Sequence, residues 1–515
     1  MKLVLTLTVA YLIIPTVIYT DIIRVPGDYT TVQGGINAAS YGDTVLVSPG
    51  VYVENINLMG KAIHLLAEDQ DEDATVLDGN NAPHPDTTST VLVISGEGRD
   101  TVIEGFTIVG GHGTISPIMY EGNRFGGGIF CQFSSPTIRN NVVKQNIAYL
   151  AAGILANISS AKIENNIVKN NYAIRAAGGL GLASQGGYYD SVAIVTGNLI
   201  YGNIAGDHAG GVEIGHGAEA LFSHNIVAFN NARSVGGVFL LGVDDRMVCS
   251  NNIIIYNTSS RLTGSGLRIG VYGSAPLITS NIVAYNDSAG GIFVMDYPIE
   301  PDINHNVVWG NTTSNFIGTD PAIGDTTWGV NENGVPCDSF HNIIRDPLLS
   351  GEFPWKWNLS YGSPCIDAGS EDLPLDPDGT VADAGAVYFS QLDSIDVTLL
   401  PLETEVEPGD TLPVQLEVEN PGTGTFSGEI WTEVELPWGD ILSPHLGPYG
   451  VEYGPGEWRS FLVPIRIPWA TPPGSTYVLT VKLGFYPDVT VSSDSFGLTV
   501  LEGGSFMGLF QHDGD

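Results

Sequence analysis

Arginine returns at one position of a repeated unit in a chain that is poor in cations. The chain has 19 Lys and Arg residues against 57 Asp and Glu residues, for a formal net charge of −38. Each repeat contains a segment that begins with a small residue, usually glycine. Three residues before that small residue, successive repeats have Arg124, Tyr149, Arg175, Asp207, Arg233, Arg261 and Asp287. A guanidinium group binds a planar carboxylate through two parallel hydrogen bonds. We therefore expect this row to bind an extended anionic polymer, such as a uronate-containing polysaccharide.

The segment after each glycine adds further side chains to this face. Apolar residues alternate there with residues of any kind, which indicates a strand with one buried face. The outward positions of successive segments are Phe130, Leu155, Gly181, Glu213, Phe239, Arg268 and Phe293, and His216 follows close behind Glu213. The predicted catalytic residues are Arg175, Asp207, His208, Glu213 and Arg233. The predicted substrate-binding residues are Arg124, Tyr149, Phe239, Arg261 and Arg268, since aromatic rings can stack on sugar faces. The competing interpretation is an exposed charge ladder that only relieves repulsion in an acidic protein.

A second periodicity identifies the elements that must position these residues. Pairs of Asn five residues apart occur at Asn141/Asn146, Asn166/Asn171, Asn198/Asn203, Asn225/Asn230, Asn252/Asn257, Asn281/Asn286 and Asn306/Asn311. Successive pairs lie 25 to 32 residues apart, a period typical of stacked units that bury each other's apolar faces. Two aliphatic residues follow each first Asn, as in Ile226-Val227, and indicate short strands.

Asn and Gly are suited to the corners between these strands, because both tolerate left-handed backbone. Stacked strands lie about 4.8 Å apart, which brings each Asn amide within hydrogen-bond reach of the same amide one rung along. The sequence therefore predicts an all-β fold, a parallel β-helix with Asn ladders, in which residues 43–345 wind as stacked parallel strands. Residues 30–41 are predicted to form a helix that covers the first rung. A leucine-rich horseshoe has a similar period, but its spaced leucines are absent.

Three parts of the chain resemble the secreted right-handed parallel β-helix proteins of the pectin-lyase-like superfamily. They are the N-terminal segment 28–52, the Asn-Asn and Gly-Gly repeats, and the closing runs 363–369, 376–380 and 383–386. The resemblance covers about residues 21–390. It implies the fold more specifically than the activity, because that superfamily includes lyases, hydrolases, esterases, epimerases and non-catalytic surface proteins.

The resemblance implies β-elimination at a uronate as one activity, with Arg or Lys as the base and calcium or further cations neutralising the carboxylate. Arg175, Arg233 or Arg261 can fill the role of base, and Asp207, Glu213 or Asp244-Asp245 can hold calcium. Hydrolysis instead requires two carboxyl groups across a bond, and Asp207 with Glu213 is the one pair that qualifies. The polygalacturonase and pectinesterase signatures are absent, and Gly215-His216-Gly217 is interpreted as a turn. A non-catalytic surface or adhesion protein is the rival prediction.

Composition divides the chain further. Residues 1–20 resemble a signal peptide and predict bacterial-type export to the cell surface or medium, with no membrane span after its removal; an uncleaved anchor is the alternative. Residues 21–345 are assigned to the β-helix and residues 346–391 to its C-terminal cap. Residues 392–502 alternate like strands between Pro-Gly turns and resemble an Ig-like β-sandwich module. Residues 503–515 form a tail. The strong negative charge argues against a nucleic-acid partner.

The remaining polar and sulfur-containing residues allow weaker predictions. Asp376, Asp378 and Asp383 crowd carboxylates around a glycine and are candidate ligands of a calcium ion, with an ordinary Asp-Gly turn as the alternative. Cys131 and Cys249 are predicted core residues, whereas Cys337 and Cys365 are left open as a disulfide pair or free thiols. Two further stacks, Lys144 with Lys169 and Phe229 with Tyr256 and Tyr285, are interpreted as solvated surface and packing on another face.

Overall fold

The computed structural model divides the chain into two compact units. One comprises residues 1–376 and 380–388, and the other comprises residues 377–379 and 389–515. The described residues are 20–80, 84–120, 122–184, 192–261, 264–271, 273–288, 290–295, 299–331, 333–351, 357–360, 362–389, 395–421, 426–437, 441–454, 456–467, 474–485 and 489–501. The predicted signal peptide and tail lie outside these residues, apart from Thr20. No described helix is long and apolar enough to cross a membrane.

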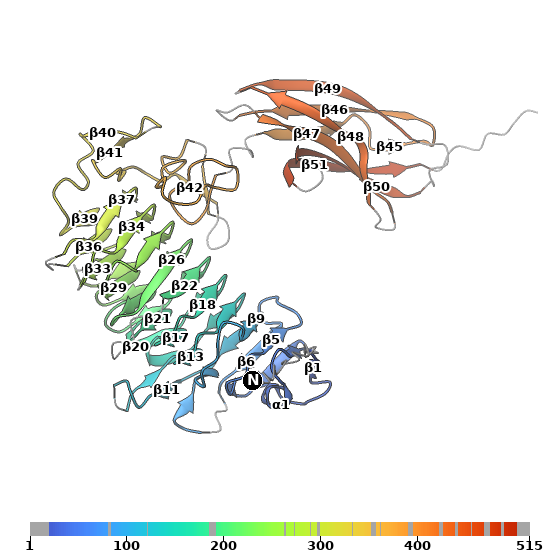
Figure 1. The fold of residues 1–515 in the computed structure, drawn as a ribbon. Coiled ribbons are helices and arrows are strands. Elements are labelled where there is room, and N and C mark those ends of the chain that lie inside the picture. Colours follow the sequence, from blue (N-terminus) through green and yellow to red (C-terminus); the bar gives the residue numbers. More distant parts are fainter. Residues whose placement is uncertain are drawn as a thin grey trace, which may run out of the picture. The chain divides into compact units, whose positions relative to one another are not determined.

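The first unit is a parallel β-helix, as predicted, and its described strands stack into four long sheets (Figure 1). Sheet A contains β1 (Ile22–Val25), β2 (Thr44–Val47), β5 (His64–Ala67), β9 (Val102–Glu104), β14 (Thr137–Arg139), β18 (Lys162–Glu164), β22 (Val192–Thr196), β26 (Glu219–Ser223), β30 (Val248–Ser250), β34 (Leu277–Thr279) and β37 (Asp302–Asn304). Sheet B contains β3 (Gly50–Val53), β6 (Thr75–Asp78), β10 (Thr107–Val109), β15 (Val142–Lys144), β19 (Ile167–Lys169), β23 (Leu199–Tyr201), β27 (Ile226–Ala228), β31 (Ile253–Ile255), β35 (Ile282–Ala284) and β38 (Val307–Trp309).

The other two sheets carry the face on which the arginines lie. Sheet C contains β4 (Ile56–Asn57), β8 (Val91–Val93), β13 (Ile129–Gln132), β17 (Ile154–Asn157), β21 (Leu180–Ala183), β25 (Val212–Gly215), β29 (Val238–Val243), β33 (Leu267–Val271), β36 (Ile292–Val294) and β39 (Phe316–Ile317). Sheet D contains β7 (Thr87–Thr88), β11 (Gly113–Ile115), β12 (Arg124–Phe125), β16 (Ile147–Leu150), β20 (Tyr172–Ala176), β24 (Ile204–Ala205), β28 (Asn231–Ala232) and β32 (Thr258–Ser259). Inward aliphatic residues of sheets A, B and C form one continuous core, whereas sheet D buries a column of alanines: Ala148, Ala173, Ala205 and Ala232.

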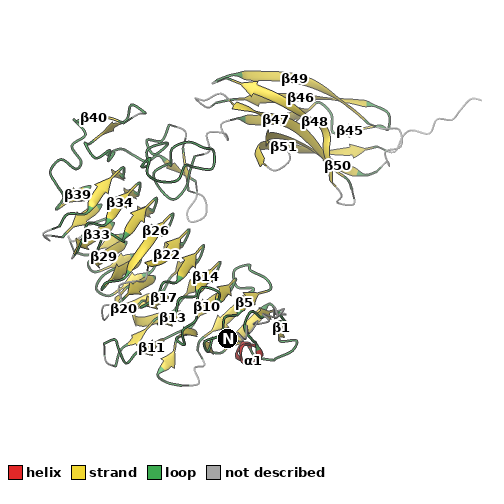
Figure 2. Cartoon of the chain, in the orientation of Figure 1, coloured by secondary structure: helices red, strands yellow, loops and turns green. Residues whose placement is uncertain are grey.

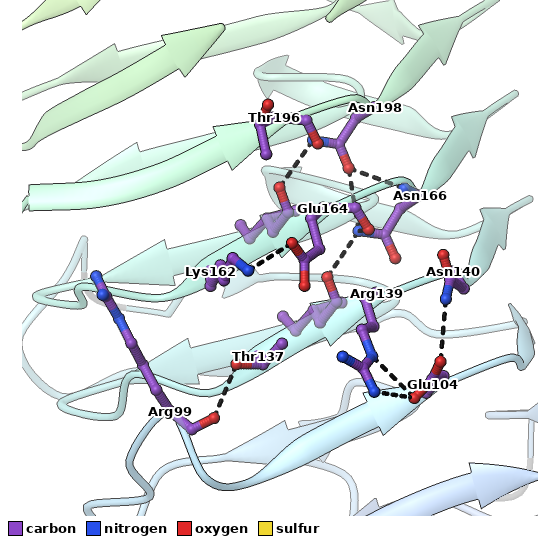
Figure 3. Close-up of polar contacts among 12 residues, drawn as sticks. Arg99, Glu104, Thr137, Arg139, Asn140, Lys162, Glu164, Asn166, Thr196 and Asn198 are labelled. Carbon is purple, nitrogen blue, oxygen red and sulfur yellow. Dashed lines mark hydrogen bonds and ion pairs between the residues drawn. The ribbon is translucent and has the colours of Figure 1, made fainter. Parts of the chain in front are cut away.

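Two buried Asn ladders hold successive rungs together, which confirms the predicted role of the repeat. Asn225 is typical: its side-chain nitrogen donates to the carbonyl oxygen of Val195 at 2.9 Å and to the side-chain oxygen of Asn252 at 3.1 Å. Figure 3 shows the same contact between Asn166 and Asn198. The residue before a ladder Asn commonly has left-handed backbone, as at Phe229 with φ 53°, which makes the corner. Both ladders extend one rung further than the sequence period indicated, to Asn342 and Asn315.

The predicted N-terminal helix exists but is shorter than 30–41. Helix α1 spans Val32–Ala38, and Figure 2 shows it in red against an otherwise strand-built unit. The Thr31 side chain caps it by accepting from the Gly34 backbone N–H at 3.0 Å, and the Glu54 carboxylate accepts from the Val32 and Gln33 backbone N–H groups. These bonds satisfy donors that a helix start leaves unpaired. Val32 and Ile36 belong to the main core, so the helix packs on the first rung.

The parallel winding predicted for residues 43–345 is interrupted in two places, near Gly113 and after β39. Strand β11 pairs antiparallel with β7 and β12, because the chain doubles back near Gly113, which has φ 80°. The cap after β39 contains two antiparallel pairs, β40 (Gly329–Val330) with β41 (Pro336–Cys337) and β42 (Leu349–Ser350) with β43 (Asn358–Leu359). Residues 43–345 are therefore mostly but not wholly parallel.

All four cysteines are buried free thiols. The open question of a bridge between Cys337 and Cys365 is thereby settled in favour of free thiols. Cys131 and Cys249 face the core as predicted. Burial raises the pKa of the Cys249 thiol to about 12, so it is not a nucleophile near neutral pH.

The interpretation of Lys144 and Lys169 as solvated residues is wrong. Their ammonium groups both contact the carboxylate of Glu72, at 2.8 Å and 2.6 Å, and Lys144 also contacts Asp73 at 2.8 Å. Both lysine side chains are less than 15% exposed (14% and 11%). The sequence could not show this, because the 69–74 loop is 71 to 97 residues away from its lysine partners. The loop is thus anchored across two rungs of sheet B.

Replacing Glu72 with Gln should lower the free energy of unfolding by about 1 kcal/mol, a modest figure because the carboxylate is partly exposed. Burial tends to raise the pKa of Glu72, but hydrogen bonds from Lys144 and Lys169 outweigh it and lower the pKa. A depressed folded-state pKa contributes stability above the unfolded pKa of about 4.3 that is lost as pH falls through the folded value. Urea unfolding at pH 7 and at pH 3 checks this, with the exposed Asp71→Asn in the same loop as control. An equal effect of both substitutions at pH 7 would contradict the anchoring role.

The outer face of sheet A carries ion pairs between partly exposed cations and largely buried carboxylates. Arg139 contacts Glu104 at 2.7 Å, and Lys162 contacts Glu164 at 2.7 Å (Figure 3). Because Lys162 is a partly exposed cation on a different sheet from the arginines, it offers a control for them.

The second unit is the predicted β-sandwich. One sheet contains β44 (Asp396–Pro401), β46 (Thr411–Glu419) and β49 (Trp458–Arg466). The other contains β45 (Glu405–Val406), β51 (Val489–Val500), β50 (Thr476–Phe485), β47 (Phe426–Glu435) and β48 (Ile441–Tyr453). Alternate apolar residues such as Val414 and Leu416 face a separate core. This unit therefore folds around its own apolar interior.

Candidate functional site

The register of sheet C confirms the predicted column of outward residues. Adjacent strands pair Phe130 with Leu155, Leu155 with Gly181, Gly181 with Glu213, Glu213 with Phe239, Phe239 with Arg268, and Arg268 with Phe293. Much of this column is nevertheless buried, with Glu213 only 7% exposed. Its N-terminal part belongs to a second apolar cluster outside the main core, to which Met119 also contributes. Outward position on a strand therefore did not predict exposure.

The predicted arginine row holds only as far as Asp207. Leu150 pairs with Ala176 and Ala176 with His208, which sets Arg175 beside Asp207. The pairing of Ala205 with Ala232 then places Arg233 opposite Gly206 rather than Asp207, and Asp287 pairs with Thr258. The prediction placed each residue by its distance from the following glycine. It was wrong for Arg233 because the segment between the second Asn and that glycine varies in length: Gly210 follows Asn203 by seven residues, but Gly236 follows Asn230 by six. Arg233 and Arg261 are exposed and lie outside the cluster described next.

Arg175 is held in place by two tyrosines. Its guanidinium lies 5.3 Å from the centre of the Tyr120 ring. A side-chain hydrogen bond with Tyr149, which outweighs the effect of burial, raises the pKa of Arg175. The raised pKa keeps Arg175 protonated, which favours anion binding over the predicted role of base. Arg124, by contrast, donates to the Thr88 hydroxyl at 2.9 Å within the β7–β11–β12 excursion.

The centre of the site is a carboxylate between two imidazoles. His208 Nε2 lies 3.5 Å and His216 Nε2 lies 3.8 Å from the same oxygen of Glu213. The other ring nitrogen of His208 faces Asp207 at 3.3 Å. Burial alone would lower the pKa of His208, but the hydrogen bond and charge of Glu213, with the charge of Asp207, raise it. His208 thus lies between two carboxylates, and the half-exposed His216 approaches Glu213 with its Nε2 atom.

Arg268 forms the other flank of the site. Its guanidinium lies 5.1 Å from the centre of the Phe239 ring and 5.4 Å from the centre of the Phe293 ring. It also donates to the Ser234 hydroxyl at 3.1 Å. Aromatic faces on both sides pre-orient this cation, because ring quadrupoles attract it. A second anchored guanidinium therefore lies two rungs from Glu213.

The sequence missed several members of this arrangement. His216 was assigned to a turn, which it is, since its φ is 56°, but that turn directs the ring at Glu213. Tyr120 lies on the excursion that breaks the repeat, so no periodicity pointed to it. Phe293 was part of the predicted outward column, but it has no charge, and only the pairing register shows that it lies beside Arg268. Ser234 lies outside that column, and only its hydrogen bond to Arg268 identifies it.

The three carboxylates predicted to bind calcium are partly committed to backbone contacts. The Asp376 carboxylate accepts from the Asp383 N–H at 2.8 Å, and the Asp383 carboxylate accepts from the Asp367 N–H at 2.7 Å. Asp378 belongs to the other unit. Among the described residues no three His, Cys, Asp or Glu side chains are grouped to hold a metal ion. Calcium binding at this loop stays a prediction.

Comparison with known proteins adds little. No protein family and no curated protein matches the chain. Among solved structures, the chain is similar to a Paenibacillus sp. cycloisomaltooligosaccharide glucanotransferase complexed with cycloisomaltoheptaose, at 17% sequence identity and a TM-score of 0.18. The match covers 21% of this chain and 14% of the glucanotransferase chain. A likeness this partial assigns neither an activity nor a ligand here.

Replacing Glu213 with Gln should lower the pKa of His208, because the substitution removes its strongest charged partner. A raised folded-state pKa contributes stability that is fully present below the unfolded pKa of about 6.5 and is lost as pH rises through the folded value. The Gln variant should therefore lose more stability at pH 5 than at pH 9. Imidazole NMR titration gives the pKa, and urea unfolding at the two pH values gives the linked stability. An unchanged His208 titration would show that Glu213 does not control this ring.

Proposed function

We propose that the β-helix binds an acidic polysaccharide along the sheet C and sheet D face and cleaves it by β-elimination. The observation that carries this proposal is the clustering of Glu213, His208 and His216 between two pre-oriented guanidinium groups. Arg175 and Arg268 can each pair with a uronate carboxylate, in a chain whose cations are otherwise scarce. Successive rungs lie about 4.8 Å apart, so this face runs along an extended polymer.

The roles follow from the geometry. Arg175 binds the uronate carboxylate and thereby acidifies the neighbouring C5–H. His216, whose Nε2 lies 3.8 Å from the Glu213 carboxylate, accepts the C5 proton at Nδ1. The C4–O bond breaks, a C4=C5 double bond forms, and the leaving oxygen takes a proton from solvent water. His208 contacts the same Glu213 oxygen and holds the carboxylate in position.

Hydrolysis by Asp207 and Glu213 is less well supported. Two catalytic carboxyl groups must face each other across the scissile bond with room for sugar or water between them. Here the two carboxylates face opposite nitrogens of the same ring, so His208 fills the space between them. The arrangement suits an oriented histidine better than a carboxyl pair.

A non-catalytic adhesion protein is the second candidate, favoured by one observation. The outer face of sheet D exposes Ile147, Tyr172, Ile174 and Ile204, each more than 40% accessible. Clustered exposed apolar side chains are typical of contact surfaces for other molecules. Both candidate functions include three further proposals: export to the cell surface, membership of the pectin-lyase-like superfamily, and an Ig-like role for the second unit.

Incubation with a panel of acidic and neutral polysaccharides tests the proposal. We expect ultraviolet-absorbing unsaturated uronate ends from at least one acidic polymer and none from neutral ones. Reducing ends without ultraviolet absorbance would indicate hydrolysis instead. Binding without any product would favour the adhesion protein, and the absence of binding to every acidic polymer would contradict the assigned face.

A further inference from the structure

A small cavity lies beside the candidate acid–base group, and Gly181 is one of its walls. In the outward column of sheet C, Gly181 lies between Leu155 and Glu213. A Cβ atom at Gly181 would lie 2.8 Å from the Ala151 Cβ atom and 3.4 Å from the Leu155 Cδ1 atom. A methyl group added at Gly181 would therefore press on Ala151, which is itself a wall of the cavity, and would change the cavity's shape.

The walls of this cavity are mostly apolar, and its one carboxyl group belongs to Glu213. Met119, Leu150, Leu155, Gly181, Glu213 and His216 line it, together with short apolar residues, and its volume is about 30 Å³. A volume above about 10–15 Å³ holds a group the size of a water molecule, so a methyl group fits but a sugar ring does not. The sheet C and sheet D face, which also carries Arg175, thus contains an apolar site of methyl size with a carboxylate at its side.

An acetamido group matches this chemistry. Its methyl group can occupy the apolar floor, its N–H can donate to the Glu213 carboxylate, and its carbonyl oxygen stays at the open mouth. The methyl group of a 6-deoxy sugar, an O-acetyl group or a methyl ester brings no donor for Glu213. A hydroxymethyl group entering the floor would bury its hydroxyl among aliphatic walls without a partner.

We propose that the cavity at Gly181 recognises the acetamido group of an N-acetylated amino sugar that neighbours the uronate in the bound polymer. This inference rests on the proposed function and narrows its substrate to polymers that combine uronates with N-acetylhexosamines. Arg175 and Gly181 lie in consecutive strands of one rung, β20 and β21, so the carboxylate of one sugar and the acetamido group of its neighbour can reach the guanidinium and the cavity from a chain that passes over this rung.

The test compares matched ligands by calorimetry. Probes are oligosaccharides of hyaluronan, unsulfated chondroitin and heparosan, the same oligosaccharides carrying N-formyl in place of N-acetyl, and oligogalacturonate as a uronate without acetamido groups. The N-formyl exchange keeps the amide and removes only the methyl group, so affinity should fall about fourfold. The Gly181→Ala variant should bind the best N-acetylated probe at least tenfold more weakly and lose the N-acetyl preference. Gly329→Ala, at a site with open space around the added methyl group, is the control for a glycine substitution.

The outcomes separate this inference from the function on which it rests. Wild-type binding to oligogalacturonate that equals or exceeds binding to every N-acetylated probe overturns the acetamido site and leaves the acidic-polysaccharide face intact. Equal affinity for N-acetyl and N-formyl probes, or undiminished binding by a folded Gly181→Ala variant, also overturns it. No binding to any acidic probe overturns both. If Gly181→Ala does not fold, the N-formyl comparison on the wild-type protein decides alone.

Discussion

Asn225→Ala is expected to destabilise the β-helix by about 3–5 kcal/mol, the upper range for a single substitution. Asn225 is fully buried, and its side chain donates to the carbonyl oxygens of Val195 and Ser223 and to Asn252. Its side-chain oxygen accepts from the backbone and side-chain nitrogens of Asn198. Alanine removes all of these bonds and takes the side-chain acceptor away from the buried Asn198 backbone N–H, at about 1–3 kcal/mol for a group left unpaired. Asn252 still accepts from the Asn225 backbone N–H, and the Asn198 side chain still donates to Ile163, so the loss is less than the sum over all the bonds.

The position of Asn225 in the middle of the ladder should also change the unfolding cooperativity. Repeat proteins gain stability from nearest-neighbour interfaces, so a weak central rung can let the two halves unfold separately. Urea unfolding followed by circular dichroism measures both the midpoint and the slope. The control is Asn231→Ala in the same rung, where the side chain is exposed and the expected change is within about 0.5 kcal/mol. Comparable losses in the two variants would contradict the ladder as a source of stability.

His216→Ala is expected to reduce the rate of β-elimination by a factor of about 10²–10⁴, the usual contribution of a positioned base. Binding of an acidic polymer without acetamido groups should change little, because the bound uronate contacts Arg175 rather than His216 in the proposed arrangement. The measurement is the initial rate of ultraviolet-absorbing product, with kcat and KM determined separately. A rise in KM with kcat unchanged would assign His216 to binding instead.

The pH dependence gives an independent check on His216. A neutral imidazole is required to accept the proton, so kcat should fall at acidic pH, where imidazole groups are protonated. Glu213→Gln, which removes the carboxylate beside the ring, should lower kcat. A rate independent of pH between 5 and 9 would exclude a histidine base.

The sequence predicted the fold well because the fold repeats. Stacked corners must satisfy the same backbone geometry at every rung, so Asn225 and its equivalents recur visibly and set the period. The site was predicted less well, because it depends on departures from the repeat. The variable segment before each glycine moved Arg233 out of the row, and the β11 excursion supplied Tyr120 from outside it.

Burial was the other quantity that the sequence did not reveal. Outward positions such as Phe130 and Glu213 are covered by residues from other rungs, and Lys169 is covered by a loop almost a hundred residues earlier in the chain. These long-range contacts leave no local pattern. The sequence placed Gly181 in the outward column, but only the neighbouring side chains in the structure show that a larger residue would not fit there.

The most direct test of the acidic-polysaccharide face is the affinity of Arg175→Ala for an acidic oligosaccharide compared with that of Lys162→Ala. Each variant loses one cation, but Lys162 lies on the outer face of sheet A, partly exposed and paired with Glu164. The assigned face predicts at least tenfold weaker binding for Arg175→Ala, near wild-type binding for Lys162→Ala, and a smaller difference at high salt. Equal affinities of the two variants at low salt would contradict it.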